Sequence, residues 1–294
     1  MSITYDYYRI FYYVAKYQNF TQAATALMNN QPNVSRAISN LEHELGCRLF
    51  IRSNRGVTLT PEGQKLYRRI SVAHRQIEMA QQELSDAKNL QNGLVSIGVS
   101  ETALHTFLLP RLEQFHQLYP DIHIKISSVL TAQAIASLKA GLVDFAVVTT
   151  PTGITRPLIE IPLMPLREIL VGGTRFAHLA RQPLKLSKLS GYPLILLNSQ
   201  ANTRAFYNRI FLEHGLSLVP EIEASVTDQV LPMIEHNLGI GFLPESLAAN
   251  GLKEGRLFEI KLDCQIEQRT VCLVKDPGYC GSIAARALEK ILRA

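Results

Sequence analysis

The side chains best suited to chemistry gather on one short stretch, residues 31 to 40, QPNVSRAISN. Val34, Ile38 and Leu41 recur at i, i+4 and i+7, which predicts one buried face of a helix. The opposite face carries hydrogen-bonding groups and a single cation, a mixture that suits contacts with base edges and phosphates in a major groove. Those side chains are Gln31, Asn33, Ser35, Arg36, Ser39 and Asn40. The alternative is a polar, solvated face on an ordinary helix.

The elements around this stretch predict how it is held. A preceding helix near residues 20 to 27 has a small apolar face, and Asn30 is a good N-cap for the second helix. Pro32 sits in the first turn, where its missing N–H costs nothing. The tyrosine-rich residues 5 to 17 predict a supporting helix. Together these features predict a helix-turn-helix.

A short hairpin is expected next, within residues 45 to 60, LGCRLFIRSNRGVTLT. An apolar run at 49–51 and the alternating Val57 and Leu59 flank a turn that contains Gly56. Arg52 and Arg55 lie at the tip of this wing, where they could contact a minor groove or phosphates.

Residues 20 to 63 resemble the winged helix-turn-helix of LysR-type transcriptional regulators. The motifs that carry the resemblance are AA–x–x–L, QP–x–VSRAI–x–x–LE, LG–x–x–LF–x–R and RGV–x–LT–x–x–G, at the family spacing. Asn33 stands where the family more often has a small residue, and Asn30 replaces the usual Ser while keeping its capping ability. The chain length and the later organisation also fit, so the resemblance covers the whole chain.

A long helix should follow the wing, starting at Thr60-Pro61-Glu62. Its apolar residues recur at alternating intervals of four and three residues, the heptad pattern that forms the apolar seam of a coiled coil. They are Leu66, Ile70, Ala73, Ile77, Ala80, Leu84 and Ala87. Such a narrow stripe needs a partner helix, most simply the same helix of a second subunit. Packing on the chain's own C-terminal domain is the alternative. In the family this segment is the linker and dimerisation arm. A dimer would present two DNA-binding domains to two half-sites, so a partly palindromic operator is expected. The family tendency also favours tetramers.

Composition fits a soluble protein of two or three domains, with 47% hydrophobic residues among 294. The sequence shows no transmembrane run and no signal peptide, so a cytoplasmic location is expected. Residues 1 to 92 hold 11 Lys and Arg against 7 Asp and Glu, and therefore carry most of the net charge of +5. Phosphate binding would require the positive excess to lie there.

Strands and helices alternate beyond residue 93, which predicts a parallel, twisted sheet with helices on both faces, twice over. The resemblance implies a two-lobed, periplasmic-binding-protein-like effector domain, with crossing strands near 159–165 and 258–266. The predicted fold class is therefore α/β, with an N-terminal winged helix-turn-helix and a long linker helix. The expected domains are 1–60 for DNA binding, 61–92 for the linker and 93–294 for the effector domain. Lobe I takes about 93–162 and 264–294, and lobe II about 163–263.

Small hydroxyl and amide side chains cluster where predicted strands end and helices begin, which is where open α/β sheets bind ligands. They are Ser100, Glu101, Thr102, Thr131, Thr149, Thr150, Asn198, Ser199, Gln200, Thr203 and Thr227. Each could instead be a simple N-cap. Family members bind their effector between the lobes at matching loops. The chemistry suits an organic acid, an amino acid or an inorganic anion. Glu101 would then point away or pair with an ammonium group, and Arg204 could supply a cation.

No catalytic or metal motif is apparent. The sequence lacks G-x-S-x-G, a P-loop, a GxGxxG that opens a helix, a CxxC pair and any His/Cys cluster with metal spacing. We therefore expect no enzyme, no cofactor and no metal. A redox-sensing pair among Cys264, Cys272 and Cys280 is an alternative to buried thiols. A solute-binding protein would suit the two lobes but not the basic N-terminal module. The favoured hypothesis is a DNA-binding regulator controlled by a small effector.

Overall fold

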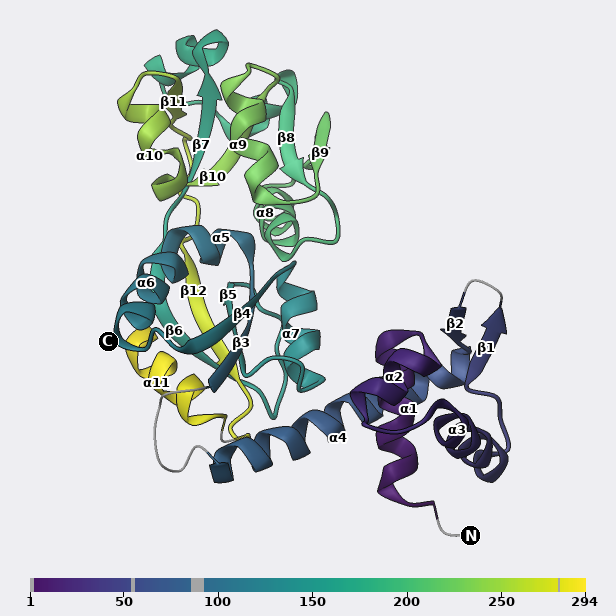
Figure 1. The fold of residues 1–294 in the computed structure, drawn as a ribbon. Helices are drawn as coiled ribbons and strands as arrows, with labels where there is room; N and C mark the ends of the chain where they lie inside the picture. Colours follow the sequence, from purple (N-terminus) through teal and green to yellow (C-terminus); the bar gives the residue numbers. More distant parts are fainter. Residues whose placement is uncertain (1–2, 54–55, 86–92, 280) are drawn as a thin grey trace. The chain divides into compact units, whose positions relative to one another are not determined.

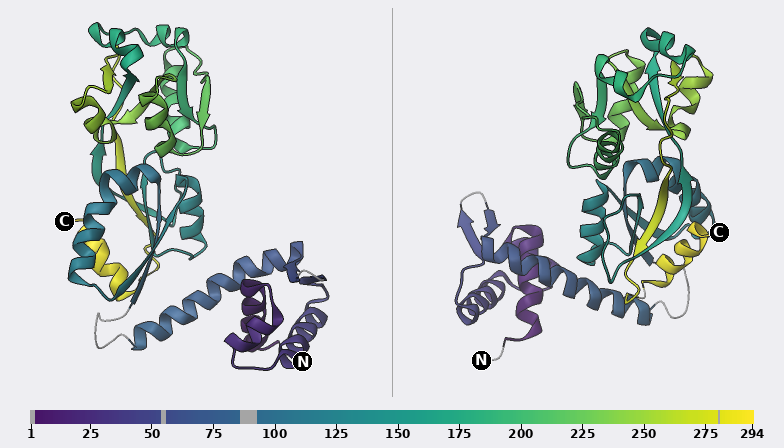
Figure 2. Two further views of the ribbon diagram at one scale, coloured as in Figure 1. Left: turned by 45° about the horizontal axis from the view of Figure 1, so that its top comes forward. Right: turned by 180° about the vertical axis from the view of Figure 1, so that it is seen from behind.

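The computed structural model describes residues 3–53, 56–85, 93–279 and 281–294, and these form two compact units (Figures 1 and 2). The first unit spans the chain up to Ser85, and the second holds nearly all of the rest. The first is helical with a two-stranded wing, and the second is a two-sheet α/β domain. This architecture confirms the predicted fold class.

The first unit is built from four helices and a hairpin around one apolar core. The buried face of the second helix of the pair is the predicted one, because Val34, Ile38 and Leu41 are each at most 1% exposed. Phe11 and Phe50 complete the centre of the core, with ring centroids 5.3 Å apart. The elements are α1 (Tyr5–Tyr17), α2 (Phe20–Ala26), α3 (Gln31–Leu45), β1 (Phe50–Ser53), β2 (Gly56–Leu59) and α4 (Pro61–Ser85).

Helix α4 starts where the sequence predicts. The Thr60 hydroxyl accepts a hydrogen bond from the Gly63 N–H at 2.9 Å, which caps the helix. A Cβ at Gly63 would lie 2.2 Å from the Leu49 carbonyl oxygen, so only glycine allows this close approach to the wing.

The predicted seam of α4 divides into two parts. Leu66 and Ile70 pack against the core of their own unit, so a partner helix does not need to cover them. Ala73 and Ile77 are less buried, with Ile77 37% exposed. The side chains of Ala80 and Leu84, and all of residues 86–92 with Ala87, lie outside the described part of the chain. An apolar stripe available to a second helix therefore begins at Ala73 and not at Leu66.

Lobe I of the second unit is a five-stranded sheet in the order β4-β3-β5-β12-β6. Strand β3 is parallel to β4 and β5, but β12 is antiparallel to both β5 and β6. The three strands of the predicted β-α-β-α-β segment, β3 to β5, are parallel as expected. Strand β12 runs in the opposite direction to β5 because it belongs to the chain as it returns from the other lobe. The strands are β3 (Gly93–Val99), β4 (Ile122–Ser128), β5 (Phe145–Thr149), β6 (Ile159–Leu166) and β12 (Arg269–Lys275).

Helices cover both faces of this sheet, as β5 illustrates. Val147 points into the core under α6 and α11, whereas Ala146 and Val148 point toward α7 on the other face. This alternation is the period of two expected for a strand buried on both sides. The helical elements are α5 (Glu101–Ala103), the π-helix η1 (Leu104–Leu108), α6 (Leu109–Leu118), α7 (Thr131–Lys139) and α11 (Ile283–Leu292).

Lobe II repeats the plan with the order β11-β7-β10-β8-β9. Strand β8 is parallel to β9 and β10, and β7 is antiparallel to β10 and β11. Residues after Pro244 continue directly as helix α10. The strands are β7 (Glu168–Gly173), β8 (Leu194–Leu197), β9 (Ile222–Ala224), β10 (Ile240–Pro244) and β11 (Leu257–Ile260). The helices are the 3-10 segments η2 (Thr174–Arg181) and η3 (Leu186–Gly191), with α8 (Asn202–Glu213), α9 (Thr227–Glu235) and α10 (Glu245–Lys253).

Two stretches join the lobes. Strand β6 ends at Leu166 and runs directly into β7, and the chain returns between the end of β11 and the start of β12 (Figure 1). The predicted crossing points, 159–165 and 258–266, fall on these stretches. The carboxyl ends of β3 and β5 and the N-termini of α8 and α9 thereby contribute to the same pockets.

Candidate functional site

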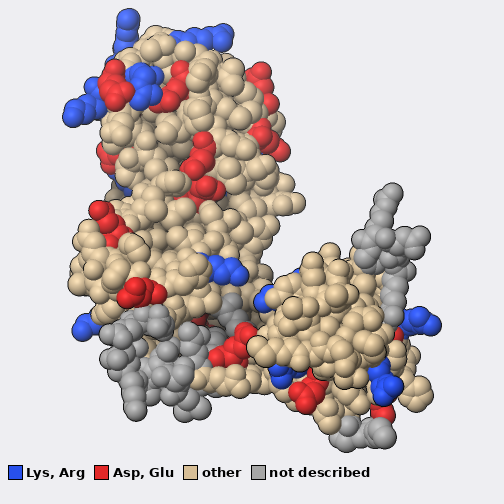
Figure 3. Space-filling view, viewed as in Figure 1, with Lys and Arg blue, Asp and Glu red and all other residues tan. Residues whose placement is uncertain are grey.

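Helix α3 presents the polar face that its sequence predicts. The Asn30 side chain accepts a hydrogen bond from the Asn33 N–H at 2.9 Å, which caps the helix. Ser35 is half-buried, and the other predicted contact residues of this helix are exposed: Gln31, Asn33, Arg36, Ser39 and Asn40. Figure 3 shows lysine and arginine side chains on the visible face of this unit. The exposed face therefore offers several donors and acceptors and the cation of Arg36.

Two of these side chains are oriented by their neighbours. Asn33 Nδ2 donates to Asn29 Oδ1 at 3.2 Å, and Asn40 Nδ2 donates to the Tyr7 hydroxyl at 3.3 Å. Both contacts lie on the exposed surface, so they restrict rotamers without removing the amides from solvent. Binding of DNA would therefore cost less side-chain entropy at Asn33 and Asn40, because their rotamers are already restricted in the free protein.

The wing is anchored to α3 by one carboxylate. Glu42 Oε1 accepts hydrogen bonds from the N–H groups of Leu49 and Phe50, at 2.7 and 3.1 Å. Strand β1 pairs antiparallel with β2 from Phe50 opposite Leu59 onward. The side chain of Arg52 and all of Arg55 lie outside the described residues, so the predicted phosphate contacts of the wing stay predictions.

Between the lobes of the second unit lie two small hollows. The first, here the hydroxyl pocket, is bordered by Glu101 and by six hydroxyl residues from both lobes, with apolar neighbours. The hydroxyl residues are Ser100, Thr102, Thr131, Thr149, Thr203 and Thr227. All six and Glu101 belong to the predicted effector set. The volume, about 30 Å³, suits roughly two water molecules.

Two features give the hydroxyl pocket its chemical character. Ser100 Oγ is buried and finds no hydrogen-bond partner within the described residues. The helices α7, α8 and α9 begin at Thr131, Asn202 and Thr227, which all line the pocket, so their first N–H groups and positive dipole ends lie at its wall. The pocket is polar and has no lysine or arginine among the described residues of its lining. The helix N-termini favour an anion, whereas the Glu101 carboxylate at the border opposes one.

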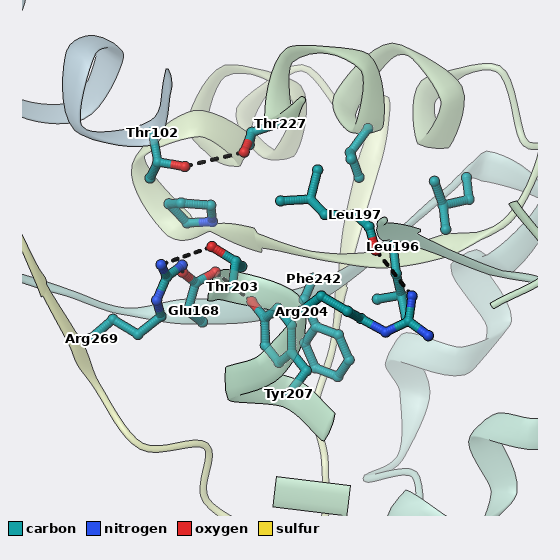
Figure 4. A pocket seen from close by; sticks show the side chains of 13 residues that line it. Thr102, Glu168, Leu196, Leu197, Thr203, Arg204, Tyr207, Thr227, Phe242 and Arg269 are labelled. Atoms are coloured by element: carbon teal, nitrogen blue, oxygen red, sulfur yellow. Dashed lines mark hydrogen bonds and ion pairs between the residues drawn. The ribbon is translucent and has the colours of Figure 1, made fainter. Parts of the chain in front are cut away.

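The second hollow, here the arginine pocket, has about 20 Å³ and is lined by Arg269 and Glu168 as well as by apolar side chains (Figure 4). At its rim the hydroxyls of Thr102 and Thr227 lie 3.2 Å apart, a hydrogen bond from one lobe to the other. Tyr207 stacks on Phe242 with ring centroids 4.5 Å apart.

Arg269 joins the two lobes. Its side chain and that of Glu168 are each 1% exposed, and Arg269 Nη1 donates to Glu168 Oε1 at 2.8 Å. Nη2 donates to the hydroxyls of Thr149 and Thr203 at 2.5 and 2.8 Å, and Nε donates to the Thr150 carbonyl at 2.6 Å. The Thr149 and Thr150 partners belong to lobe I, whereas Glu168 and Thr203 belong to lobe II. All three guanidinium nitrogens therefore donate hydrogen bonds, and the positive charge is balanced by Glu168 inside the protein.

Tyr207 supports this ion pair from lobe II. Its hydroxyl donates to Glu168 Oε2 at 2.7 Å. Burial, followed by the neighbouring Glu168 carboxylate, raises the pKa of Tyr207 well above its ordinary value. The phenol consequently stays protonated and acts as a donor throughout the physiological pH range.

Arg204 does not supply a free cation. It is buried, and its Nη1 donates to the Leu197 carbonyl at 3.0 Å and to Glu223 at 3.2 Å. Nε donates to Asn208 and Nη2 to the Leu218 carbonyl. The residue ties α8 to the end of β8, with its charged end directed toward Leu197 in Figure 4.

Four predicted effector residues lie outside the lining of both pockets. The Thr150 hydroxyl accepts from the Thr270 N–H at 2.9 Å, and Asn198 Oδ1 accepts from the Gln200 N–H at 3.1 Å. Ser199 and Gln200 are exposed on the turn before α8. These four assignments stay predictions. Sequence reasoning missed Glu168, Tyr207 and Arg269, although a charged residue that opens an otherwise apolar strand is a detectable signal.

Cys264 and Cys272 are poor redox sensors. Burial, followed by Glu160, raises the pKa of the Cys272 thiol to about 12. Burial and the nearby Asp263 also raise the pKa of Cys264. Because the thiolate is the reactive form, these shifts lower the reactivity of both thiols at neutral pH. Cys280 lies outside the described residues.

Comparison with known proteins identifies the family. Residues 5–64 match the model of the bacterial regulatory helix-turn-helix protein, lysR family, and residues 88–294 match the LysR substrate binding domain. The chain belongs to the LysR family of transcriptional regulators. As a LysR regulator it combines a helix-turn-helix DNA-binding domain with an effector-binding domain, and it is not an enzyme. None of the described helices is long and apolar enough to cross a membrane.

Relatives and solved LysR structures match almost end to end. A probable RuBisCO transcriptional regulator of Gracilaria tenuistipitata var. liui is 28% identical, covering 99% of this chain and 96% of that protein. A full-length OxyR variant from Pseudomonas aeruginosa has a TM-score of 0.74 at 22% identity, covering 99% of this chain and 94% of that one. Full-length CbnR in complex with its target DNA has a TM-score of 0.71 at 15% identity, with 99% of both chains covered. At these identities the two structures show that the fold is shared.

Proposed function

We propose that α3 reads a promoter or operator through its exposed polar face. Gln31, Asn33 and Asn40 would contact base edges, and Ser35, Ser39 and Arg36 would contact bases or phosphates. The wing arginines Arg52 and Arg55 would bind phosphates or the minor groove. The support is the combination of a capped, rigidly anchored helix with an exposed face that carries amides and a guanidinium. The location that goes with this proposed role is the cytoplasm.

We also propose that two chains join through α4. Ala73 and Ile77 begin an apolar stripe on a helix of 25 residues, which is about 38 Å long at 1.5 Å per residue. A symmetric pair would place two copies of α3 on two half-sites, so a partly palindromic operator fits. Pairing of dimers into tetramers is the further expectation from the family.

The effector site, we infer, is the hydroxyl pocket. The observation that carries this inference is Ser100 Oγ, a buried hydroxyl without a partner among the described residues, at the wall of a pocket where three helices begin. Burying an unsatisfied hydroxyl costs about 1–3 kcal/mol, which a ligand would recover. With the charge of Arg269 balanced by Glu168, the pocket would hold an anion through hydroxyls and backbone N–H groups. The proposed class is therefore a small oxyanion or carboxylate.

Size sets a condition on this proposal. The hydroxyl pocket, at about 30 Å³, is much smaller than the roughly 300–1,000 Å³ that typically encloses an organic ligand. An organic acid would thus require the lobes to separate and break the Thr102–Thr227 hydrogen bond, whereas a small inorganic anion would not. A difference in lobe angle between the free and bound states would couple the effector to the DNA-binding unit, provided that the effector prefers one arrangement.

The proposal is tested by thermal unfolding of the full chain in the presence of inorganic oxyanions, organic acids and amino acids. A genuine effector should raise the melting temperature of the wild type and lose most of this effect in Ser100→Ala and Thr131→Ala. The matched control is Ser187→Ala, an exposed serine on η3. A compound that protects all four proteins equally does not bind in the hydroxyl pocket.

A further inference from the structure

Three potential metal ligands converge at the edge of the hydroxyl pocket. Glu101 and His105 lie four residues apart at the start of the helical run that begins lobe I, and Asp228 lies in the first turn of α9 in lobe II. His105 Nε2 is 3.0 Å from Asp228 Oδ2. One ligand atom from each of the three residues lies within 4.8 Å of the other two. We call this group the acid–histidine cluster; in the described part of the chain it is the only such group.

An ordinary ion pair does not account for the whole cluster. His105 and Asp228 would satisfy each other, but Glu101 is then a second carboxylate facing Asp228. Two carboxylates and one imidazole carry more negative than positive charge. The arrangement therefore favours an additional positive charge among these three side chains.

Two further observations point to a ligand at this place. His105 lies in the five-residue π-helix Leu104–Leu108, a rare geometry that is frequent at functional sites. Ser100, next to Glu101 in the chain, has the buried hydroxyl that lacks a described partner, in the same pocket that Glu101 borders. Three protein ligands leave coordination positions open for water on a metal ion. Water held there would offer hydrogen bonds to neighbouring polar groups of the pocket.

We propose that Glu101, His105 and Asp228 form a binding site for a divalent transition-metal ion. An imidazole with two carboxylates suits zinc, manganese, iron, cobalt or nickel, whereas calcium and magnesium prefer all-oxygen sites. The ion would take two ligands from lobe I and one from lobe II, and so would fasten the lobes together beside the Thr102–Thr227 hydrogen bond. A bound metal ion would change the angle between the lobes, and the regulatory effect of that change rests on the proposed effector function. The existence of the metal-binding site does not depend on that function.

The sequence cannot show this site because Asp228 is far from the other two residues in the chain. Only the Glu-x-x-x-His spacing on one helix is local, and that pattern is common on solvated helices. The tertiary fold brings the third ligand from the opposite lobe.

The test is isothermal titration calorimetry on the full-length, tag-free protein after treatment with a chelator. Zinc, manganese and calcium chlorides are titrated separately, with His105→Asn and Asp228→Asn as site variants. His116→Asn, an exposed histidine on α6, is the matched control. We expect one equivalent of zinc or manganese per chain and weak binding of calcium. Each site variant should lose at least about tenfold in affinity, because even outer-shell changes commonly cost about 10–100-fold, and the control should bind as the wild type does.

Several outcomes would overturn the proposal. Wild type without measurable zinc or manganese binding excludes the site, and equal affinity in wild type and both site variants places the metal elsewhere. If amine-bearing compounds bind in the presence of chelator, with an affinity that depends on Asp228 but not on His105, the cation is an ammonium group and not a metal. The thermal-unfolding screen for anions, with Ser100→Ala, is carried out separately in the presence of a chelator. Loss of anion binding can then be distinguished from loss of metal binding.

Discussion

The buried pair of Arg269 and Glu168 offers the sharpest energetic test of how the lobes are held together. Replacing Arg269 by Met removes the cation and its hydrogen bonds to both lobes, and leaves the Glu168 carboxylate buried with the Tyr207 hydroxyl as its remaining described side-chain donor. Removing one partner of a buried ion pair costs about 3–5 kcal/mol, because the remaining charge is uncompensated. Adding Glu168→Gln removes that charge while keeping an oxygen that accepts from Tyr207.

The double variant should therefore be more stable than Arg269→Met alone. The hydroxyls of Thr149 and Thr203 lose a partner in both variants, at roughly 1 kcal/mol each, so this loss cancels in the comparison. We expect the second substitution to recover about 2 kcal/mol, because replacing both partners of a buried pair is much less costly than breaking it. For a domain of this size that recovery corresponds to roughly 4–8 °C in melting temperature.

The assay is urea and thermal unfolding of the full-length variants, followed by circular dichroism. The matched control is the exposed pair Arg209 and Glu267, which are 2.7 Å apart with side chains 54% and 61% exposed. The corresponding changes there, Arg209→Met and Glu267→Gln, should each alter the free energy of unfolding by less than about 1 kcal/mol. If Glu168→Gln destabilises the Arg269→Met protein further, an uncompensated carboxylate is not the origin of the cost, and the reasoning fails.

Three further predictions concern the first unit. Arg36→Ala should weaken binding to a specific operator fragment by about tenfold, the effect of roughly 1–3 kcal/mol expected for a base or phosphate contact; unchanged fluorescence anisotropy titrations would exclude the role. Ile77→Glu should shift the mass measured by light scattering toward the monomer, because it places a charge on the exposed apolar stripe; a mass that stays dimeric moves the interface elsewhere. Burial, only partly offset by Glu78, lowers the pKa of His74 from 6.5. As the pH falls, the histidine of the unfolded state therefore binds a proton at a higher pH than the histidine of the folded state, so the free energy of unfolding should decrease below about pH 6.5. His74→Gln should reduce this loss as the pH falls through that value, and parallel urea midpoints for the two proteins would contradict the assignment.

Local interactions account for what could be predicted from the sequence. Val34, Ile38 and Leu41 face the core because their spacing alone decides which side of α3 they share, and the caps at Asn30 and Thr60 act within three residues. The order of strands and helices follows from the same short-range patterns, with helix α10 as an element that was missed. Six of the predicted hydroxyl residues and Glu101 line one pocket, because strand ends and helix starts can be read along the chain. Their role in effector binding stays a prediction.

Interactions between distant segments decided the rest. The direction of β12 depends on the chain's return from lobe II, which no local pattern encodes. Whether Leu66 faces a partner subunit or its own core depends on where α1 packs, and the heptad spacing is the same in both cases.

The sequence by itself thus determined the family, the exposed polar face of α3 and the set of candidate hydroxyls, because each depends on residues that are neighbours along the chain. Only the tertiary structure decided which charges meet. Arg269 finds Glu168, and Asp228 finds His105, across the boundary between the lobes. The physical reason is that such pairs form only when the fold closes the long stretch of chain between them. The strength of a charge pair also depends on burial, which the linear order of residues does not specify.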